Sequence, residues 1–143
     1  MSYQNLIKRI KKNEGFSKKA YLDQLGFMTI GYGHLILKHE TSLTNNKISK
    51  ARLEKIFNED FKKALAEYKK LLHKNTSNKK DRELLIEMSF QMGAKKVLMF
   101  KKLLINMRKN HKHLVCFEMM NSLWYNQTPK RVKNLIKIFL NNE

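Results

Sequence analysis

The stretch that decides the fold is residues 13–34, NEGFSKKAYLDQLGFMTIGYGH. It contains two carboxylates, Glu14 and Asp23, in surroundings that are otherwise basic and apolar. β-branched and aromatic residues, which favour strands, alternate here with glycines, which favour turns. We therefore predict a small twisted antiparallel sheet over about residues 17–37. The two carboxylates are then either solvated surface charges or groups that face each other across a site.

Helical periodicity flanks this stretch on both sides. Residues 3–13 carry apolar side chains on one face, and Gly15 follows as a helix-ending residue. A second apolar stripe at helical spacing runs from Ser49, a candidate cap, to about His73. At 1.5 Å per residue this helix would be more than about 30 Å long, enough to join two lobes. The polar residues 38–47 between sheet and helix are predicted to be a loop.

The C-terminal half is predicted to be helical throughout. The expected helices span about residues 82–92, 95–108, 112–124 and 129–140. Asp81 and Thr128 are candidate caps, and Pro129 is favoured in a first helical turn. Trp124 falls at a core position of this pattern. So do six methionines, namely Met88, Met92, Met99, Met107, Met119 and Met120.

Composition bounds the function without choosing it. The chain has 143 residues, 30 Lys and Arg against 12 Asp and Glu, and a formal net charge of +18, so it should bind polyanions. Its N-terminus lacks the apolar core of a signal peptide and no apolar run reaches membrane-spanning length, so we expect folding in a cytoplasm. Cys116 is the single cysteine and is expected to be a small buried hydrophobe. His111 and His113 are two apart, which favours a solvated pair over a metal site.

The two carboxylates suit one chemistry in particular. Cleavage of a glycosidic bond needs a protonated donor for the leaving oxygen and a carboxylate on the opposite face. Glu14 falls at the expected C-terminal end of a helix, where the helix dipole disfavours a further negative charge. Asp23 follows within the expected sheet, and a chain that folds back as a hairpin can set it across a cleft from Glu14. On spacing alone, solvated surface carboxylates remain the alternative.

Four ordered blocks of sequence resemble the phage-type lysozymes, glycoside hydrolase family 24. The first block is Glu14-Gly15, Tyr21, Asp23, Gly26 and Thr29-Ile30-Gly31-Tyr32-Gly33-His34. The others are Phe57-Asn58-Glu59-Asp60, Phe90-Gln91-Met92-Gly93, and Trp124-Tyr125-Asn126-Gln127-Thr128-Pro129 with Arg131 just after. The resemblance implies an α+β, mainly helical lysozyme-like fold in one domain. It implies a sheet lobe over about residues 13–60, joined by a long helix to a helical lobe of about residues 61–143 plus 1–12.

The resemblance also implies a reaction. Glu14 matches the general acid, Asp23 the carboxylate that positions or activates water, and Thr29 a hydroxyl that helps to hold that water. The implied reaction is hydrolysis of the β-1,4 bond between N-acetylmuramic acid and N-acetylglucosamine in bacterial peptidoglycan, with inversion. No cofactor or metal is implied, and we expect a monomer.

Further residues are assigned by the same resemblance. The implied substrate contacts are Leu35, Phe90, Tyr21, Gly33 and Gln91. Arg131 is expected to pair with the catalytic glutamate, and His34 with Asp60 in a buried structural ion pair. The sequence departs from the family pattern at Leu25, Leu103 and Glu118, which concerns substrate affinity and not the reaction type.

Two readings remain beside the enzyme. In the first, a non-enzymatic cationic protein would bind walls or permeabilise membranes through residues 130–139, KRVKNLIKIF, a basic amphipathic helix. Ordinary packing of that helix against its own lobe is the alternative explanation of the pattern. The second, nucleic-acid binding, rests on charge alone, and we expect no specific nucleic-acid partner. Anionic cell-wall polymers are the partners that the charge adds to peptidoglycan.

Overall fold

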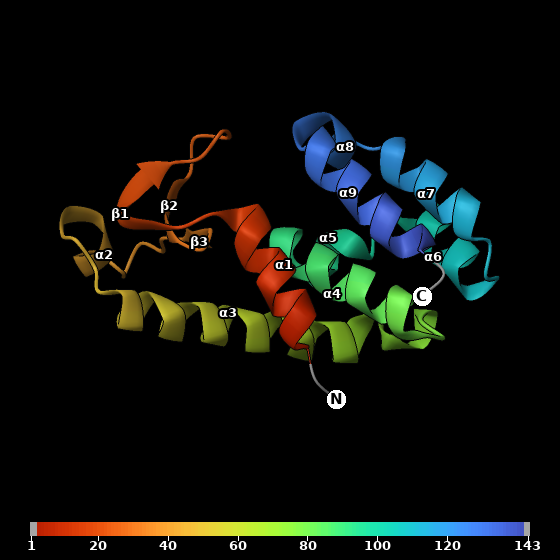
Figure 1. The fold of residues 1–143 in the computed structure, drawn as a ribbon, viewed down its shortest axis with the longest axis horizontal. Coiled ribbons are helices and arrows are strands. Elements are labelled where there is room, and N and C mark those ends of the chain that lie inside the picture. The colour runs from red at the N-terminus through yellow and green to blue at the C-terminus, as the bar shows by residue number, and fades with distance from the viewer. Residues whose placement is uncertain (1–2, 142–143) are drawn as a thin grey trace. The chain divides into compact units, whose positions relative to one another are not determined.

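The computed structural model describes residues 3–141 (Figure 1). The first elements are α1 (Gln4–Glu14), β1 (Ser17–Leu22), β2 (Met28–Gly31), β3 (His34–Leu35), α2 (Ser42–Asn45) and α3 (Lys50–Leu71). After them come η1 (His73–Asn75), α4 (Lys79–Met92), α5 (Ala94–Val97), α6 (Lys101–Arg108), α7 (Lys112–Met120), α8 (Leu123–Gln127) and α9 (Pro129–Leu140). A small sheet in a mainly helical chain confirms the predicted α+β class.

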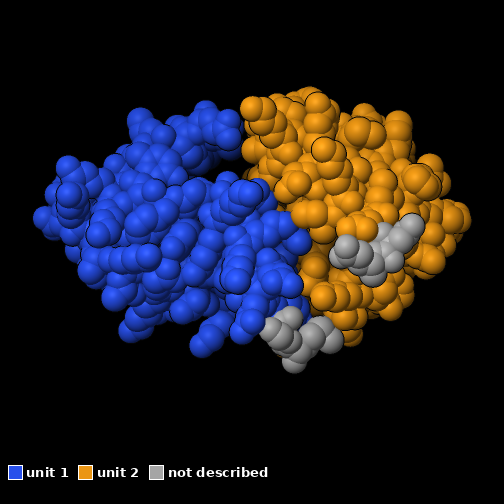
Figure 2. Space-filling model, viewed as in Figure 1, with its two compact units in different colours: residues 1–63 blue, residues 64–143 orange. Residues whose placement is uncertain are grey.

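The chain divides into two compact units, Met1–Lys63 and Ala64–Glu143 (Figure 2). Unit 1 holds α1, the sheet, α2 and the first part of α3, and unit 2 holds the remaining helices. The structure thus groups α1 with the sheet, whereas the sequence analysis assigned residues 1–12 to the helical lobe. The single-domain organisation stays a prediction.

The sheet of unit 1 is antiparallel with strand order β1-β2-β3. Its central strand β2 pairs Thr29 with Tyr21 of β1 and with Leu35 of β3. Residues that pair directly across antiparallel strands point to the same face, so these three side chains form one row. The next pair, Ile30 with His34, points to the opposite face.

The core of unit 1 lies on the Ile30 face of the sheet. Ile30 is fully buried in a cluster with Leu43 of α2, Leu53 of α3, and Ile48, which lies just before α3. This packing fixes the strand register, because a shift of one residue would bring Thr29 into the core instead. The row of Tyr21, Thr29 and Leu35 is therefore held on the face away from that cluster.

The core of unit 2 is formed by helix faces. The α4 residues Leu85, Ile86 and Met88 are fully buried, and α4 packs against α5 and α9. Trp124 is buried, as predicted. In α9 the apolar residues Val132, Leu135 and Phe139 are buried, which confirms ordinary packing as the explanation of the 130–139 pattern.

Most predicted helices are confirmed, and the differences occur at connections. Residues 38–47 were predicted to be a loop but contain the short helix α2. Its one buried side chain is Leu43, and a single apolar residue does not produce a helical periodicity in the sequence. The helix predicted over 95–108 is broken between α5 and α6, at Phe100, whose ring packs edge-on against Trp124. The one predicted over 112–124 is broken at Ser122, which accepts a hydrogen bond from the Tyr125 amide and so begins α8.

Two predicted caps and the end of α3 are corrected. The cap of α4 is Asn78, which accepts from the amide of Asp81, while Asp81 lies within the first turn and accepts from the Ser77 amide. Thr128 precedes Pro129 as predicted, but its hydroxyl donates to the Trp124 carbonyl and does not cap α9. α3 ends at Leu71 and the 3-10 helix η1 follows.

Two of the six methionines predicted for the core lie at the surface. Met88, Met107 and Met119 are buried and Met92 is partly buried. Met99 is 76% exposed because it lies in the link between α5 and α6, where the helical spacing stops. Met120, the last residue of α7, points to the outer face of that helix and is 45% exposed.

Candidate active site

Glu14 is the last residue of α1, and its side chain lies against the turn between β2 and β3. Gly15 ends the helix with φ +73°, and its amide donates to the Lys11 carbonyl. The neighbour of the carboxylate is Gly33: a Cβ added there would collide with Glu14 Oε2 and lie 2.9 Å from Glu14 Cδ. Only glycine therefore allows the carboxylate to approach the backbone here, and the φ of +75° at Gly33 favours glycine independently.

Asp23 is held by the turn that joins β1 to β2. Its Oδ1 accepts hydrogen bonds from the amides of Leu25 and Phe27, each at 2.9 Å. Its own amide donates to the Phe27 carbonyl, also at 2.9 Å. Aspartate favours such turns because its short side chain reaches the backbone a few residues on. The carboxylate is thus positioned by its own hairpin, and both bonds fall on one oxygen.

Thr29 lies in the central strand, between the two other members of its row. Its side chain is buried, and its hydroxyl donates to the Phe27 carbonyl at 2.9 Å. A hydroxyl that donates one hydrogen bond keeps acceptor capacity. Tyr21 and Leu35, paired with it on either side, are exposed.

Tyr21 experiences both carboxylates. Its pKa is raised above the ordinary value, first by partial burial and then by the negative charges of Glu14 and Asp23. A phenolate beside two carboxylates would be destabilised, and this is why their charges raise the pKa. Glu14 and Asp23 are nine positions apart in sequence, and both raise the pKa of this one side chain.

A cluster of three side chains connects α1 to the Gly31-Tyr32-Gly33 turn. Glu54 of α3 accepts from Lys11 Nζ through Oε2 and from the Tyr32 hydroxyl through Oε1, each at 2.7 Å. Lys11 Nζ also lies 4.9 Å from the centre of the Tyr32 ring. The bonds to Lys11 and Tyr32 lower the pKa of Glu54, and the bond to Glu54 raises the pKa of Tyr32 to about 12.

This Lys11–Glu54–Tyr32 cluster holds the two segments that place Glu14. Lys11 is one turn before Glu14 in α1, and Tyr32 directly precedes Gly33. Neither Glu54 nor the role of Tyr32 could be foreseen from the sequence, because Glu54 is 43 positions from Lys11 and 22 from Tyr32 and no local pattern connects them.

His34 forms the expected contact with Asp60 and a second one that was not foreseen. Its Nδ1 lies 2.7 Å from Asp60 Oδ2, and its Nε2 lies 2.9 Å from Glu40 Oε1. The bond to Asp60 raises the His34 pKa to about 9, against the opposing effect of burial and with help from Glu40. The imidazole is therefore a cation that ties β3 to α3 and to the segment before α2. The pair is part-buried, less than the resemblance implied.

In unit 2, the site residues that the family resemblance assigns contact other residues of the same unit. Gln91 Oε1 accepts from Trp124 Nε1 at 3.0 Å and Gln91 Nε2 donates to the Thr128 hydroxyl at 3.5 Å, so both ends of this amide are engaged within the unit. Arg131 Nη2 lies 3.6 Å from Oε2 of Glu87, a fully buried residue of α4 that the sequence analysis did not single out. Phe90 is partly buried. The pairing of Arg131 with Glu14 stays a prediction.

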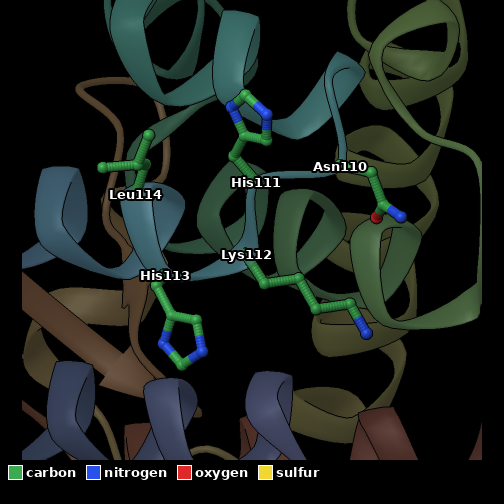
Figure 3. A pocket seen from close by; sticks show the side chains of 5 residues that line it. All are labelled: Asn110, His111, Lys112, His113 and Leu114. Carbon is green, nitrogen blue, oxygen red and sulfur yellow. The ribbon is translucent and has the colours of Figure 1, made fainter.

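Other predicted features are found at the surface or in the core. Cys116 is buried, and burial raises its thiol pKa to about 11. His111 and His113 are exposed and line an open hollow together with Asn110, Lys112 and Leu114 (Figure 3). In the part of the chain that the structure describes, no cluster of three His, Cys, Asp or Glu could hold a metal ion. Over residues 3–141, no helix is both long and apolar enough to span a membrane.

A comparison with known protein families identifies the family of this chain. The family model described as phage lysozyme matches residues 11–137, which include Glu14, the sheet and most of the helices of unit 2. The chain belongs to the phage lysozyme family. The predicted resemblance is thereby confirmed.

The chain is also similar to individual proteins. The chain is 32% identical over 155 aligned positions to "Probable T4-type lysozyme 2" of Dictyostelium discoideum, covering 91% of this chain and 90% of that protein. "Probable T4-type lysozyme 1" of the same organism is 28% identical, with 90% and 89% covered. The "Pre-baseplate central spike protein Gp5" of Enterobacteria phage T4 is 26% identical; 95% of this chain aligns with 28% of that longer protein.

Proposed function

We propose that this member of the phage lysozyme family is a muramidase. It hydrolyses the β-1,4 bond between N-acetylmuramic acid and N-acetylglucosamine in bacterial peptidoglycan. Glu14 is the general acid that protonates the leaving oxygen. Asp23 and Thr29 hold the attacking water on the opposite face of the sugar, and the anomeric configuration inverts.

The observation that carries the proposal is that Glu14 and Asp23 both lie near Tyr21, in the row that contains Thr29. The Glu14 carboxylate lies on Gly33, and the charges of Glu14 and Asp23 both raise the pKa of Tyr21, the cross-strand partner of Thr29. These observations support a site at the row of Tyr21, Thr29 and Leu35, with Glu14 as the proton donor and with Asp23 and Thr29 as the groups that hold the water. Inversion requires this division of roles between two carboxyl groups.

Substrate contacts follow from the same row. Tyr21 and Leu35 flank Thr29 and are exposed, so they can pack against a sugar ring. Phe90, Gln91 and the backbone at Gly33 are proposed as further contacts, and Arg131 as a partner of Glu14. The +18 charge favours approach to an anionic wall. The family match spans both units, which supports a single catalytic domain.

The test is the release of reducing ends from purified peptidoglycan. Glu14→Gln should lower the rate roughly 100- to 10,000-fold, the range for loss of a general acid. Glu59→Gln is the matched control, since it removes an exposed carboxylate of α3 in the same unit and should leave the rate unchanged.

The sugar at the new reducing ends shows which glycosidic bond is cleaved. Borohydride reduction should convert N-acetylmuramic acid, and not N-acetylglucosamine, to its alditol. Reduced N-acetylglucosamine would show cleavage of the other glycosidic bond. A folded wild type without any release would overturn the enzyme proposal, and an active Glu14→Gln would remove Glu14 from the acid role.

A further inference from the structure

The outer face of α7 carries an apolar patch. Leu114, Phe117 and Met120 recur at a spacing of three residues, and Leu123 begins the next helix, α8. Their exposed fractions are 49%, 54%, 45% and 70% respectively. We call these four residues the α7 patch. It lies entirely within unit 2.

The patch is not explained by the packing of α7. That helix already buries its opposite face through Val115, Cys116 and Met119, against α6, α8 and α9. Single exposed leucines are ordinary, but adjacent large apolar side chains on one helix face mark an interaction surface.

The part of unit 2 that contains the α7 patch is strongly cationic in sequence. Between Ala94 and Asn141 the sequence contains eleven Lys and Arg residues, and Glu118 is the only Asp or Glu. Lys112 and two histidines line the same open hollow as Leu114, at the start of α7 (Figure 3). The complementary surface is therefore both anionic and able to take up apolar side chains.

We propose that the α7 patch docks unit 2 onto the surface of an anionic lipid bilayer. Phe117 and its apolar neighbours would enter the boundary between headgroups and acyl chains, and the flanking lysines would stay at the lipid phosphates. An anionic glycan or a nucleic acid satisfies the lysines but offers no acyl chains to the patch. This docking is independent of the proposed hydrolysis.

The experiment is co-sedimentation of the full chain with vesicles. The protein should bind vesicles of phosphatidylcholine mixed with phosphatidylglycerol and should bind pure phosphatidylcholine much less. Phe117→Ser should weaken binding to the mixed vesicles about tenfold or more, because the burial of one aromatic side chain is lost. Leu37→Ser is the matched control: Leu37 is 53% exposed but belongs to unit 1, so binding should be unchanged.

Two outcomes would overturn the proposal. If Phe117→Ser binds like the wild type while high salt abolishes binding, the attraction is that of charge alone and extends to any polyanion. If sedimentation without vesicles shows that the wild type dimerises and Phe117→Ser does not, the patch covers a second copy of the chain. Circular dichroism checks that both variants fold. Glu14→Gln should bind vesicles like the wild type, so failure of the hydrolase proposal would leave this result unaffected.

Discussion

The two units hold their important side chains in different ways. In unit 1, Asp23 and Glu14 are positioned by backbone: amides of a tight turn hold the first, and a glycine without a Cβ admits the second. In unit 2, Leu85 and Trp124 are positioned by packing between helices. The comparison teaches that a small backbone change in unit 1 should act on the site, whereas loss of volume in unit 2 should act on stability.

The largest expected effect is on the core of unit 2. Leu85→Ala should lower the free energy of unfolding by about 3 kcal/mol, since it removes a fully buried side chain and leaves a cavity. The rate of peptidoglycan cleavage well below the melting temperature should stay the same. Urea denaturation and the reducing-end assay measure the two quantities. Leu123→Ala is the control: this leucine is mostly exposed, and its loss should cost less than about 0.5 kcal/mol. Equal destabilisation by both would contradict the assigned core.

The next effect concerns the Glu14 contact. Gly33→Ala should reduce kcat/KM about 100-fold, because the new Cβ displaces the carboxylate, and a misplacement of about 1 Å can cost that much. Gly93→Ala separates displacement from backbone strain, since Gly93 has a similar φ of +87° but nothing within 4 Å of its added Cβ. The Gly93→Ala variant should be destabilised to a similar degree as Gly33→Ala and should stay active. A fully active Gly33→Ala would show that the close approach is not needed.

The smallest effect is the pH dependence of the His34 cluster. A folded-state pKa of about 9, raised from 6.5, means that the stabilisation is complete below about pH 6.5 and is lost as the pH rises through 9. Its size is about 2 kcal/mol, after allowance for partial exposure. Urea denaturation of wild type and His34→Gln should show a gap in unfolding free energy at pH 6 that has largely closed at pH 10. A gap that does not change with pH would mean that His34 is not held as a cation.

What could be predicted from the sequence was mostly local. Gly15 and Pro129 act on neighbouring backbone, so the end of α1 and the start of α9 were readable from their chemistry. Asp23 was expected within the sheet but lies in the turn between β1 and β2. Periodicity located the long helix α3, and the overall resemblance to a family supplied the candidate site residues. The helix breaks at Phe100 and Ser122 were not readable, because contacts with other segments determine them.

The missed residues are the acidic partners of basic or polar groups. Glu40, Glu54 and Glu87 each meet a partner from another element, and a lone glutamate in a basic chain looks like a surface charge. The prediction that two exposed methionines belong to the core was wrong for the opposite reason. Met99 and Met120 fit the helical spacing in the sequence. The helix is interrupted at Met99, however, and Met120 lies on the outward face of α7.

The turn around Asp23 has a practical consequence. Both of its amide bonds fall on Oδ1, and an asparagine keeps an oxygen that can accept them. Asp23→Asn should therefore preserve the hairpin while it replaces the second carboxylate oxygen with a group that cannot serve as a base. Such a variant would be a catalytic trap, which could capture an intact glycan strand and allow its bound ring conformation to be observed directly.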